Sequence, residues 1–172
     1  MGHFFTLVIF AIIALPIVSP PVYASDLAVG QNIPFSVGNY TWRYEESGSL
    51  FIQSDVNPKT LAHYDLSDCM FCSGDEDNCQ KDGIRSFRLT QTKDEPLLLV
   101  ACHIGAHSQK LQIFAPLRDR ANPVQVTVGA YYVDYEIKDA EVLIRYDKYN
   151  PEGAPTQHIY RWPDEVQDDG RN

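Results

Sequence analysis

The sequence predicts an all-β fold: an antiparallel sandwich or small barrel of about eight strands, with a disulfide-linked irregular loop. Short segments of alternating apolar and polar residues recur along the chain, and each has the period of a strand with one face in a core. Turn-forming residues separate these segments, and there is hardly any helical periodicity. No repeat of fixed period is found, which argues against a propeller or a solenoid.

The longest apolar run after the N-terminal segment, Pro96–Ile104, predicts the central strand of this fold. It has the length of a strand and no polar face, as expected of a strand that is buried on both sides. Alternation in an extended chain puts Leu97, Leu99, Ala101 and His103 on one side and Leu98, Val100, Cys102 and Ile104 on the other. Cys102 is therefore expected in the middle of the core.

Seven other segments are predicted as strands. The first two form a hairpin around Ser47-Gly48, and the first strand exposes one face to water. Within Val124–Ile137 the apolar residues change from even to odd positions, which predicts a β-bulge at Gly129-Ala130. The seven segments are Tyr40–Glu46, a strand that starts at Leu50, Ile84–Gln91, Lys110–Ala115, Val124–Ile137, Asp139–Tyr149 and Gln157–Trp162.

Residues 54–83 interrupt the strand pattern with a stretch dominated by turn-forming residues. Three of the four cysteines lie in it, and Lys59–Leu66 is compatible with one helical turn. A free loop of this length is unusual in a compact domain, so we expect cross-links to order it.

The N-terminus predicts export. Phe4–Ser19 is almost wholly apolar but shorter than the ~20 residues of a membrane helix, and Val22 and Ala24 fit a signal-peptidase site. We therefore expect residues 1–24 to be a signal peptide, with a retained anchor as the alternative. Residues 25–163 are predicted as one β domain and the acidic residues 164–172 as a disordered tail. The expected location is the periplasm or the cell exterior.

The formal net charge of −9 limits the classes of partner. Nucleic acids and anionic lipids attract basic surfaces, so neither is expected as a ligand, and no membrane insertion is expected after signal cleavage. An acidic protein can instead attract a basic protein. The alternative is that the charge serves solubility alone.

The cysteines Cys69, Cys72, Cys79 and Cys102 predict disulfides, because they follow a signal peptide. We expect two of the first three to bond to each other and the third to bond Cys102, in an order that the sequence leaves open. Zinc held by the first three with His63 is the alternative, but this set lacks the second half of a zinc motif. A redox Cys-x-x-Cys pair normally opens a helix, which this context does not offer.

Two other groups are candidate contacts for a ligand. Asp75, Glu76 and Asp77 form an acidic cluster that begins like a calcium loop and then departs from the pattern, so it is predicted as a solvated acidic loop. Tyr131 and Tyr132 are adjacent, so a regular strand must turn one of them outward, where tyrosine can anchor an interface. The alternative for the tyrosines is packing between strands.

His103 and His107 are candidate binding residues and, with a carboxylate such as Asp134, the basis of a hydrolase or metal-enzyme hypothesis. A helix would align two histidines four residues apart, but Gly105 and the β context argue against a helix. The sequence has no nucleophile elbow, phosphate-binding loop, dinucleotide fingerprint or His-Glu-x-x-His motif. No catalytic residue, resident metal or cofactor is therefore predicted.

We therefore expect an exported, non-enzymatic binding protein, such as an acidic inhibitor or immunity-type protein for a cationic partner like a wall-degrading enzyme. The alternatives are the small hydrolase above and a structural or envelope-assembly module. The sequence leaves open the partner, the oligomeric state and whether the Asn39 sequon is glycosylated.

Overall fold

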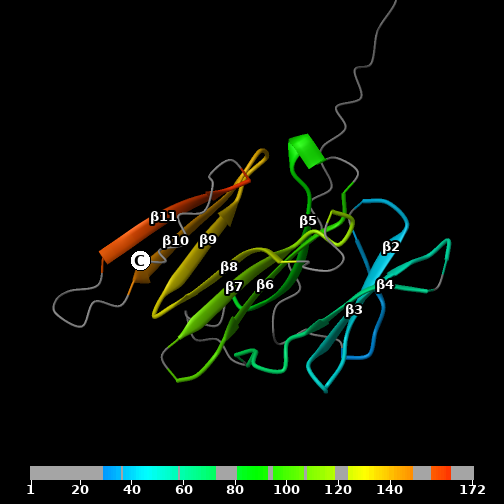
Figure 1. Cartoon of the computed structure of the whole chain (residues 1–172), viewed down its shortest axis with the longest axis horizontal. Coiled ribbons are helices and arrows are strands. Elements are labelled where there is room, and N and C mark those ends of the chain that lie inside the picture. The colour runs from blue at the N-terminus through cyan, green and yellow to red at the C-terminus, as the bar shows by residue number, and fades with distance from the viewer. Residues whose placement is uncertain are drawn as a thin grey trace, which may run out of the picture.

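The computed structural model describes residues 29–35, 37–57, 59–72, 81–92, 95–106, 108–118, 124–148 and 156–163. Within these ranges the chain has eleven strands in three antiparallel sheets and no α-helix, which confirms the predicted all-β class (Figure 1). No helix suited to crossing a bilayer occurs in this described part. The predicted signal peptide and acidic tail lie outside it.

The three sheets follow one another along the chain. In the first sheet, the order is β1 (Ile33–Pro34), β2 (Tyr40–Tyr44), β3 (Ser49–Ser54) and β4 (Thr60–Asp65). The central sheet consists of β5 (Gly83–Phe87), β6 (Leu97–His103), β7 (Gln109–Phe114) and β8 (Val124–Ala130). The third sheet has the order β11 (Thr156–Trp162), β10 (Val142–Lys148) and β9 (Val133–Ile137). A short 3₁₀ turn, Thr90–Thr92, lies between β5 and β6.

The central sheet lies between the other two, so the domain has three layers (Figure 1). As predicted, β6 is buried on both faces, because its first six residues are all buried. Its even-numbered side chains contribute to one core together with the first sheet: Leu98, Val100 and Cys102 with Trp42, Leu50 and Ile52. Its odd-numbered side chains contribute to a second core together with the third sheet: Leu97, Leu99 and Ala101 with Val133, Tyr135 and Ile144.

Two sequence predictions about strands were wrong. Thr60–Asp65 is strand β4 and not a helical turn, because the buried Ala62 and Tyr64 alternate with the exposed His63 and Asp65. Gly129 pairs with Lys110 in regular register, so no bulge lies there. The chain leaves the central sheet after Ala130 and enters the third sheet at Val133. The change of apolar phase therefore marks a change of sheet.

The predicted hairpin of β2 and β3 is confirmed, and its turn depends on Gly48. Gly48 has φ +83°, and a Cβ there would lie 2.6 Å from the Cα of Ser67. Gly30 has a similar φ of +78° with nothing within 4 Å of its Cβ position.

We expect Gly30→Ala to cost about 1–2 kcal/mol of unfolding free energy, the penalty of a left-handed alanine. Gly48→Ala should cost more, because the added Cβ also meets the backbone of Ser67. Equal losses of unfolding free energy for the two variants in urea would contradict this contact.

The open end of the β6–β7 hairpin is closed by an ion pair between Glu95 and Arg118, at 2.8 Å. Burial raises the pKa of the Glu95 carboxyl above its usual 4.5, and Arg118 opposes this shift. A raised folded-state pKa favours the fold fully below pH 4.5, and this contribution disappears as the pH rises through the folded-state value. As the pH rises through this range, urea unfolding should therefore show the wild type losing stability relative to Glu95→Gln. If the wild type instead gains stability relative to this variant, the attraction of Arg118 outweighs the effect of burial on the Glu95 carboxyl.

Candidate functional site

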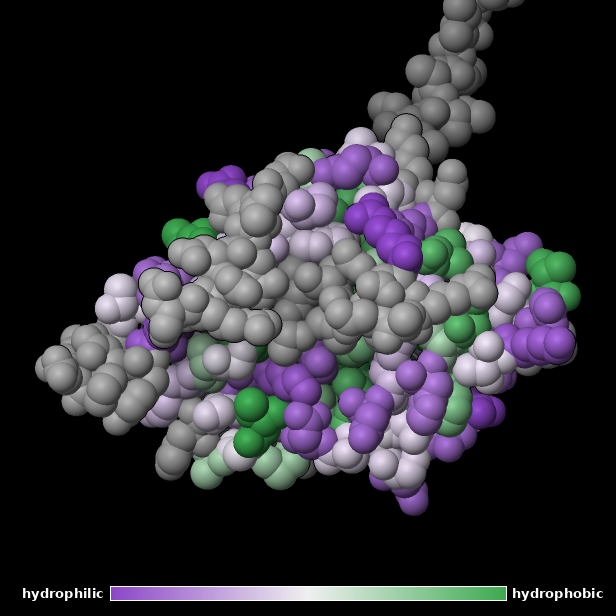
Figure 2. Space-filling model, viewed as in Figure 1, coloured by the Kyte–Doolittle hydropathy of each residue, from purple (hydrophilic) through white to green (hydrophobic). Residues whose placement is uncertain are grey.

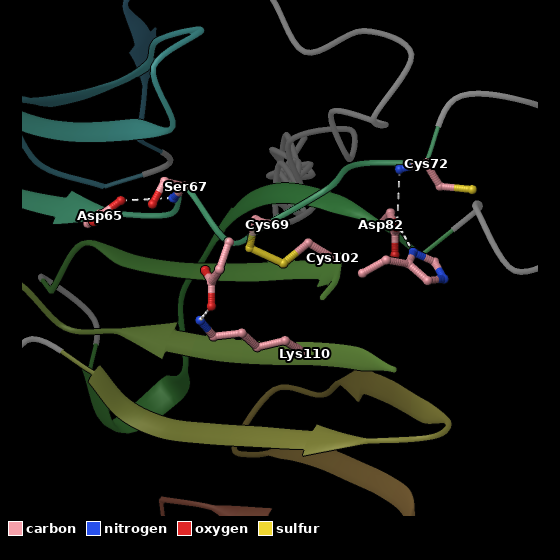
Figure 3. The surroundings of a disulfide bond; sticks show 9 residues. Asp65, Ser67, Cys69, Cys72, Asp82, Cys102 and Lys110 are labelled. Carbon is pink, nitrogen blue, oxygen red and sulfur yellow. Dashed lines mark hydrogen bonds and ion pairs between the residues drawn. A yellow bond between two sulfur atoms is a disulfide. The ribbon is translucent and has the colours of Figure 1, made fainter. Parts of the chain in front are cut away.

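A disulfide between Cys69 and Cys102 ties the segment after β4 to the central strand (Figure 3). The two Cα atoms are 5.4 Å apart, and both residues are buried in the first core. Beside this bond the backbones of Met70 and His103 exchange two hydrogen bonds, of 2.8 and 2.9 Å. The prediction that a loop cysteine bonds Cys102 is confirmed, and that cysteine is Cys69.

Cys72 is also in a disulfide, so none of the described cysteines is free. Its partner falls outside the described residues, as do Cys79 and the acidic residues Asp75, Glu76 and Asp77. The segment that carries these residues leaves the described structure after Cys72 and rejoins it at Lys81.

Next to the disulfide, the buried carboxylate of Asp82 holds the His103 ring (Figure 3). His103 Nδ1 lies 2.7 Å from Asp82 Oδ2, and the backbone N–H of Cys72 donates to the same oxygen at 3.1 Å. The Asp82 side chain is only 3% exposed, and its burial raises the pKa of the carboxyl, while the two hydrogen bonds and the His103 charge oppose the shift. Asp82 therefore holds both the imidazole of His103 and the backbone of Cys72, the last described residue before the 73–80 segment.

The other ring nitrogen of His103 contacts Gln109 on β7. The Val133 N–H donates to Gln109 Oε1 at 3.0 Å, so the amide nitrogen of Gln109 faces His103 Nε2, at 3.3 Å. This arrangement places the hydrogen of a neutral imidazole on Nδ1, toward Asp82. One hydrogen-bond chain thus connects the Cys72 backbone, the central sheet and the start of β9.

The described residues of the predicted hydrolase, His103 and Asp134, each contact other side chains. Asp134 forms an ion pair with Lys81 and another with Arg145, at 3.4 Å from its Nη1. The carboxylate that holds His103 is Asp82, and His107 falls outside the described residues. Cys72 cannot act as a nucleophile while its sulfur is in a disulfide. The Asp82–His103 pair therefore has the geometry of an oriented imidazole whose second nitrogen contacts Gln109.

Four exposed residues pair with or directly follow residues of the strand row that carries His103, and we call Met70, Ile104, Tyr131 and Tyr132 the exposed rim. Met70 bridges His103, and Ile104 follows His103 in the chain. His103 pairs with Gln109 across β6 and β7, Gln109 pairs with Ala130 across β7 and β8, and Tyr131 and Tyr132 come next. The exposed fractions of the rim residues range from 38% at Ile104 to 60% at Tyr131. The sequence predicted that one of the two tyrosines faces outward from a strand; both are exposed, and they lie between β8 and β9.

Basic side chains near the site are paired with carboxylates. Lys110 contacts Asp68 at 2.7 Å (Figure 3), and Lys81 contacts Asp134. Burial and the charges of Arg145 and Arg85 lower the pKa of the Lys81 amine. These cations are therefore neutralised locally, and the acidic residues 75–77 add further negative charge to the segment anchored here.

Exposed hydrophobic residues also occur outside the exposed rim. Figure 2 shows that the described part of the face it draws carries separate hydrophobic groups among hydrophilic residues. Of the large exposed hydrophobic residues, Val56 at 78% lies in the β3–β4 turn and Ile159 at 56% lies on β11, so neither belongs to the central sheet. These two positions provide control sites for tests of the rim.

A metal could use a different ligand set from the one that the sequence suggested. Donor atoms of Cys72, Asp82 and His103 lie within 4.8 Å of one another. His63 instead stacks on Phe51, with ring centroids 4.6 Å apart, and Cys69 is in a disulfide. The sequence-predicted zinc set is therefore not formed by its described members.

Comparison with family models, curated proteins and solved structures finds no match to this chain.

Removing the Asp82 carboxylate should destabilise the protein. Asp82→Ala leaves the Cys72 N–H and His103 Nδ1 without their acceptor, and an unsatisfied buried group costs about 1–3 kcal/mol. Asp82→Asn keeps one acceptor oxygen and should cost less. Urea unfolding of both variants checks this order. Equal stabilities for Asp82→Ala and the wild type would mean that the pair does not hold the site together.

Proposed function

We propose that this protein is an exported, non-enzymatic binding protein that caps a basic protein, in the manner of an acidic inhibitor or immunity-type protein. In this proposal the chain is cleaved before Ser25 and acts in the periplasm or at the cell exterior. A wall-degrading enzyme is the type of partner that the proposal names.

The observation that carries the proposal is the group of exposed apolar side chains at one end of the central sheet, in a chain whose net charge is −9. The exposed rim supplies two tyrosines and two aliphatic side chains, and aromatic anchors often dominate the energy of an interface. The segment with Asp75, Glu76 and Asp77 is anchored at the same place, by Cys72 and Asp82. Exposed apolar side chains on a protein of net negative charge suit a basic partner.

The site is also cross-linked, which favours binding by a pre-organised surface over binding by a segment that folds on its partner. The Cys69–Cys102 disulfide, the Met70–His103 bridge and the Asp82 hydrogen bonds all fix the backbone that carries the rim. A pre-organised surface loses less conformational entropy on binding, so more of its contact energy appears as affinity.

The test is capture with the mature chain, residues 25–172, from the exported proteins of its host at low and moderate salt. We expect a basic protein to be retained at low salt and less of it at moderate salt, because salt screens charge attraction. Titration with that purified partner then gives the affinity, and its activity is measured with and without the bound chain. The absence of any basic partner at both salts would remove the proposal.

Variants assign the surface. Tyr131→Ala/Tyr132→Ala should weaken binding at least tenfold, as expected when central aromatic anchors are lost. Asp75→Asn/Glu76→Gln/Asp77→Asn should slow association and flatten its salt dependence. The matched control, Val56→Ala, removes an exposed hydrophobic side chain from the β3–β4 turn and should change neither property. Equal losses in the control and the tyrosine variant would place the interface elsewhere.

A further inference from the structure

Three potential metal ligands of different chemistry meet where the 73–80 segment is anchored. They are the sulfur of Cys72, a carboxylate oxygen of Asp82 and a ring nitrogen of His103, all within 4.8 Å of one another. In the oxidised protein the sulfur is in a disulfide and is not a thiolate. We infer that reduction of this disulfide turns the three residues into a binding site for a thiophilic divalent cation such as Zn²⁺.

The distances suit such a cation. Zinc lies about 2.0–2.3 Å from its nitrogen, oxygen and sulfur ligands, so two ligand atoms of a tetrahedral site are about 3.3–3.8 Å apart. The donor atoms lie within 4.8 Å of one another, so a movement of about 1 Å closes the site. Cys72 is partly exposed and is released by reduction, whereas Asp82 and His103 are held beside the central sheet. Cys72 is therefore the ligand that moves.

The charges of the ligands also suit a divalent cation. A dithiol reductant supplies two electrons to the disulfide, each sulfur takes up one proton, and the dithiol is itself oxidised to a disulfide. When the cation binds, the Cys72 thiol releases its proton to solvent. One thiolate and one carboxylate then balance the two positive charges of the cation, which lowers the cost of holding it in a partly buried place. Three protein ligands leave a fourth position for water.

The imidazole must also move its hydrogen. His103 Nδ1 faces Asp82 and is the nitrogen on the side of Cys72, so a cation there requires the hydrogen to be on Nε2. Nε2 now faces the amide nitrogen of Gln109, which must turn to offer its oxygen. Gln109 is thus a positioning residue that opposes the cation, and Gln109→Glu, which presents an acceptor, should tighten binding.

The test uses Co²⁺ as the probe, because cobalt bound to a thiolate has a charge-transfer absorption band that oxygen and nitrogen ligands do not give. Cys79 is the remaining cysteine of the sequence, so Cys79→Ser frees Cys72 and leaves the Cys69–Cys102 bond in place. Under anaerobic conditions we expect this variant to bind one Co²⁺ with the band. Competition with Zn²⁺ should remove the band.

Matched variants separate this site from incidental binding. Cys72→Ser/Cys79→Ser lacks the same disulfide and also the thiol, so the band should disappear and the affinity fall at least tenfold. Cys79→Ser/His103→Ala should weaken binding by at least the same factor, and Cys79→Ser/Gln109→Glu should strengthen it. Equal affinity of the thiol-free variant would overturn the inference.

The wild type gives a second measurement that does not depend on the folding of any variant. After mild treatment with a dithiol that leaves the buried Cys69–Cys102 bond intact by mass spectrometry, and after removal of the reagent, it should bind Co²⁺ with the same band, whereas untreated protein should not. Circular dichroism confirms that the sheets persist. A native spectrum without the band in the treated protein would overturn the inference, as would the band in the untreated protein.

Discussion

Replacing both Cys69 and Cys102 by alanine should lower the free energy of unfolding by about 3–4 kcal/mol, one of the two largest effects that we predict. The bond closes a loop with a sequence separation of 33 residues. In the chain-entropy account, a cross-link restricts the unfolded chain, and its effect grows with the logarithm of this length. The measurement is urea unfolding of the double variant and the wild type under oxidising conditions.

Repeating both curves with reductant present is the control for this prediction. The wild type then loses the cross-link as well, so the difference between the two proteins should largely vanish. If the oxidised proteins were equally stable, the Cys69–Cys102 bond would not be the constraint that holds residues 59–72 against the central sheet. Mass spectrometry of exported wild type that found four free thiols would contradict the bond itself.

The sequence contained enough information for the central strand because its signal is local. Residues from Leu97 to Cys102 are all apolar, and such a run has few other solutions in a chain dominated by short strands. The two-sided burial of β6 followed directly from the absence of a polar face. The three-layer arrangement did not follow, because it depends on which outer sheet covers each face, and that pairing involves residues far apart in the sequence.

The site was only partly predictable for the same reason. His103 and the tyrosine pair stood out by residue type, and the structure brings them to one end of the central sheet. Asp82 and Gln109 were missed as partners of His103. Asp82 lies in the irregular stretch 54–83, and its position depends on the pairing of Gly83 with Ala101. The 3₁₀ turn and loop between β5 and β6 hide that register from the sequence.

Strand β4 and the β8–β9 break were missed because the signals were weak or had two interpretations. Ala62 and Tyr64 are the only buried side chains of β4, and a small residue and a tyrosine make a poor alternating pattern. A change of apolar phase arises from a bulge or from a change of sheet, and the sequence around Gly129 is compatible with both. Only the pairing of Val133–Ile137 with β10 decides between them.

Substituting either of two consecutive leucines in β6 should be severely destabilising, which is the second large effect. Leu98 and Leu99 point to opposite faces, and both are fully buried, one in each core. Leu→Ala in a packed core costs about 2–5 kcal/mol through lost burial and the cavity left behind. We therefore expect each single variant to lose this much in urea unfolding, whereas a two-layer fold would show a large loss for only one of them.

The third sheet supplies the matched control, because adjacent strands of it carry one buried and one exposed isoleucine. Ile144 on β10 is fully buried, whereas Ile159 on the adjacent strand β11 is 56% exposed. Ile144→Ala should cost about 2–5 kcal/mol, and Ile159→Ala should stay within about 1 kcal/mol, since less surface is buried. A small cost for Leu98→Ala or Leu99→Ala, beside a large one for Ile144→Ala, would show that one face of the central sheet is not covered. The rim around His103 would then be part of a wider open surface, and the variants that test binding would need to be redesigned for it.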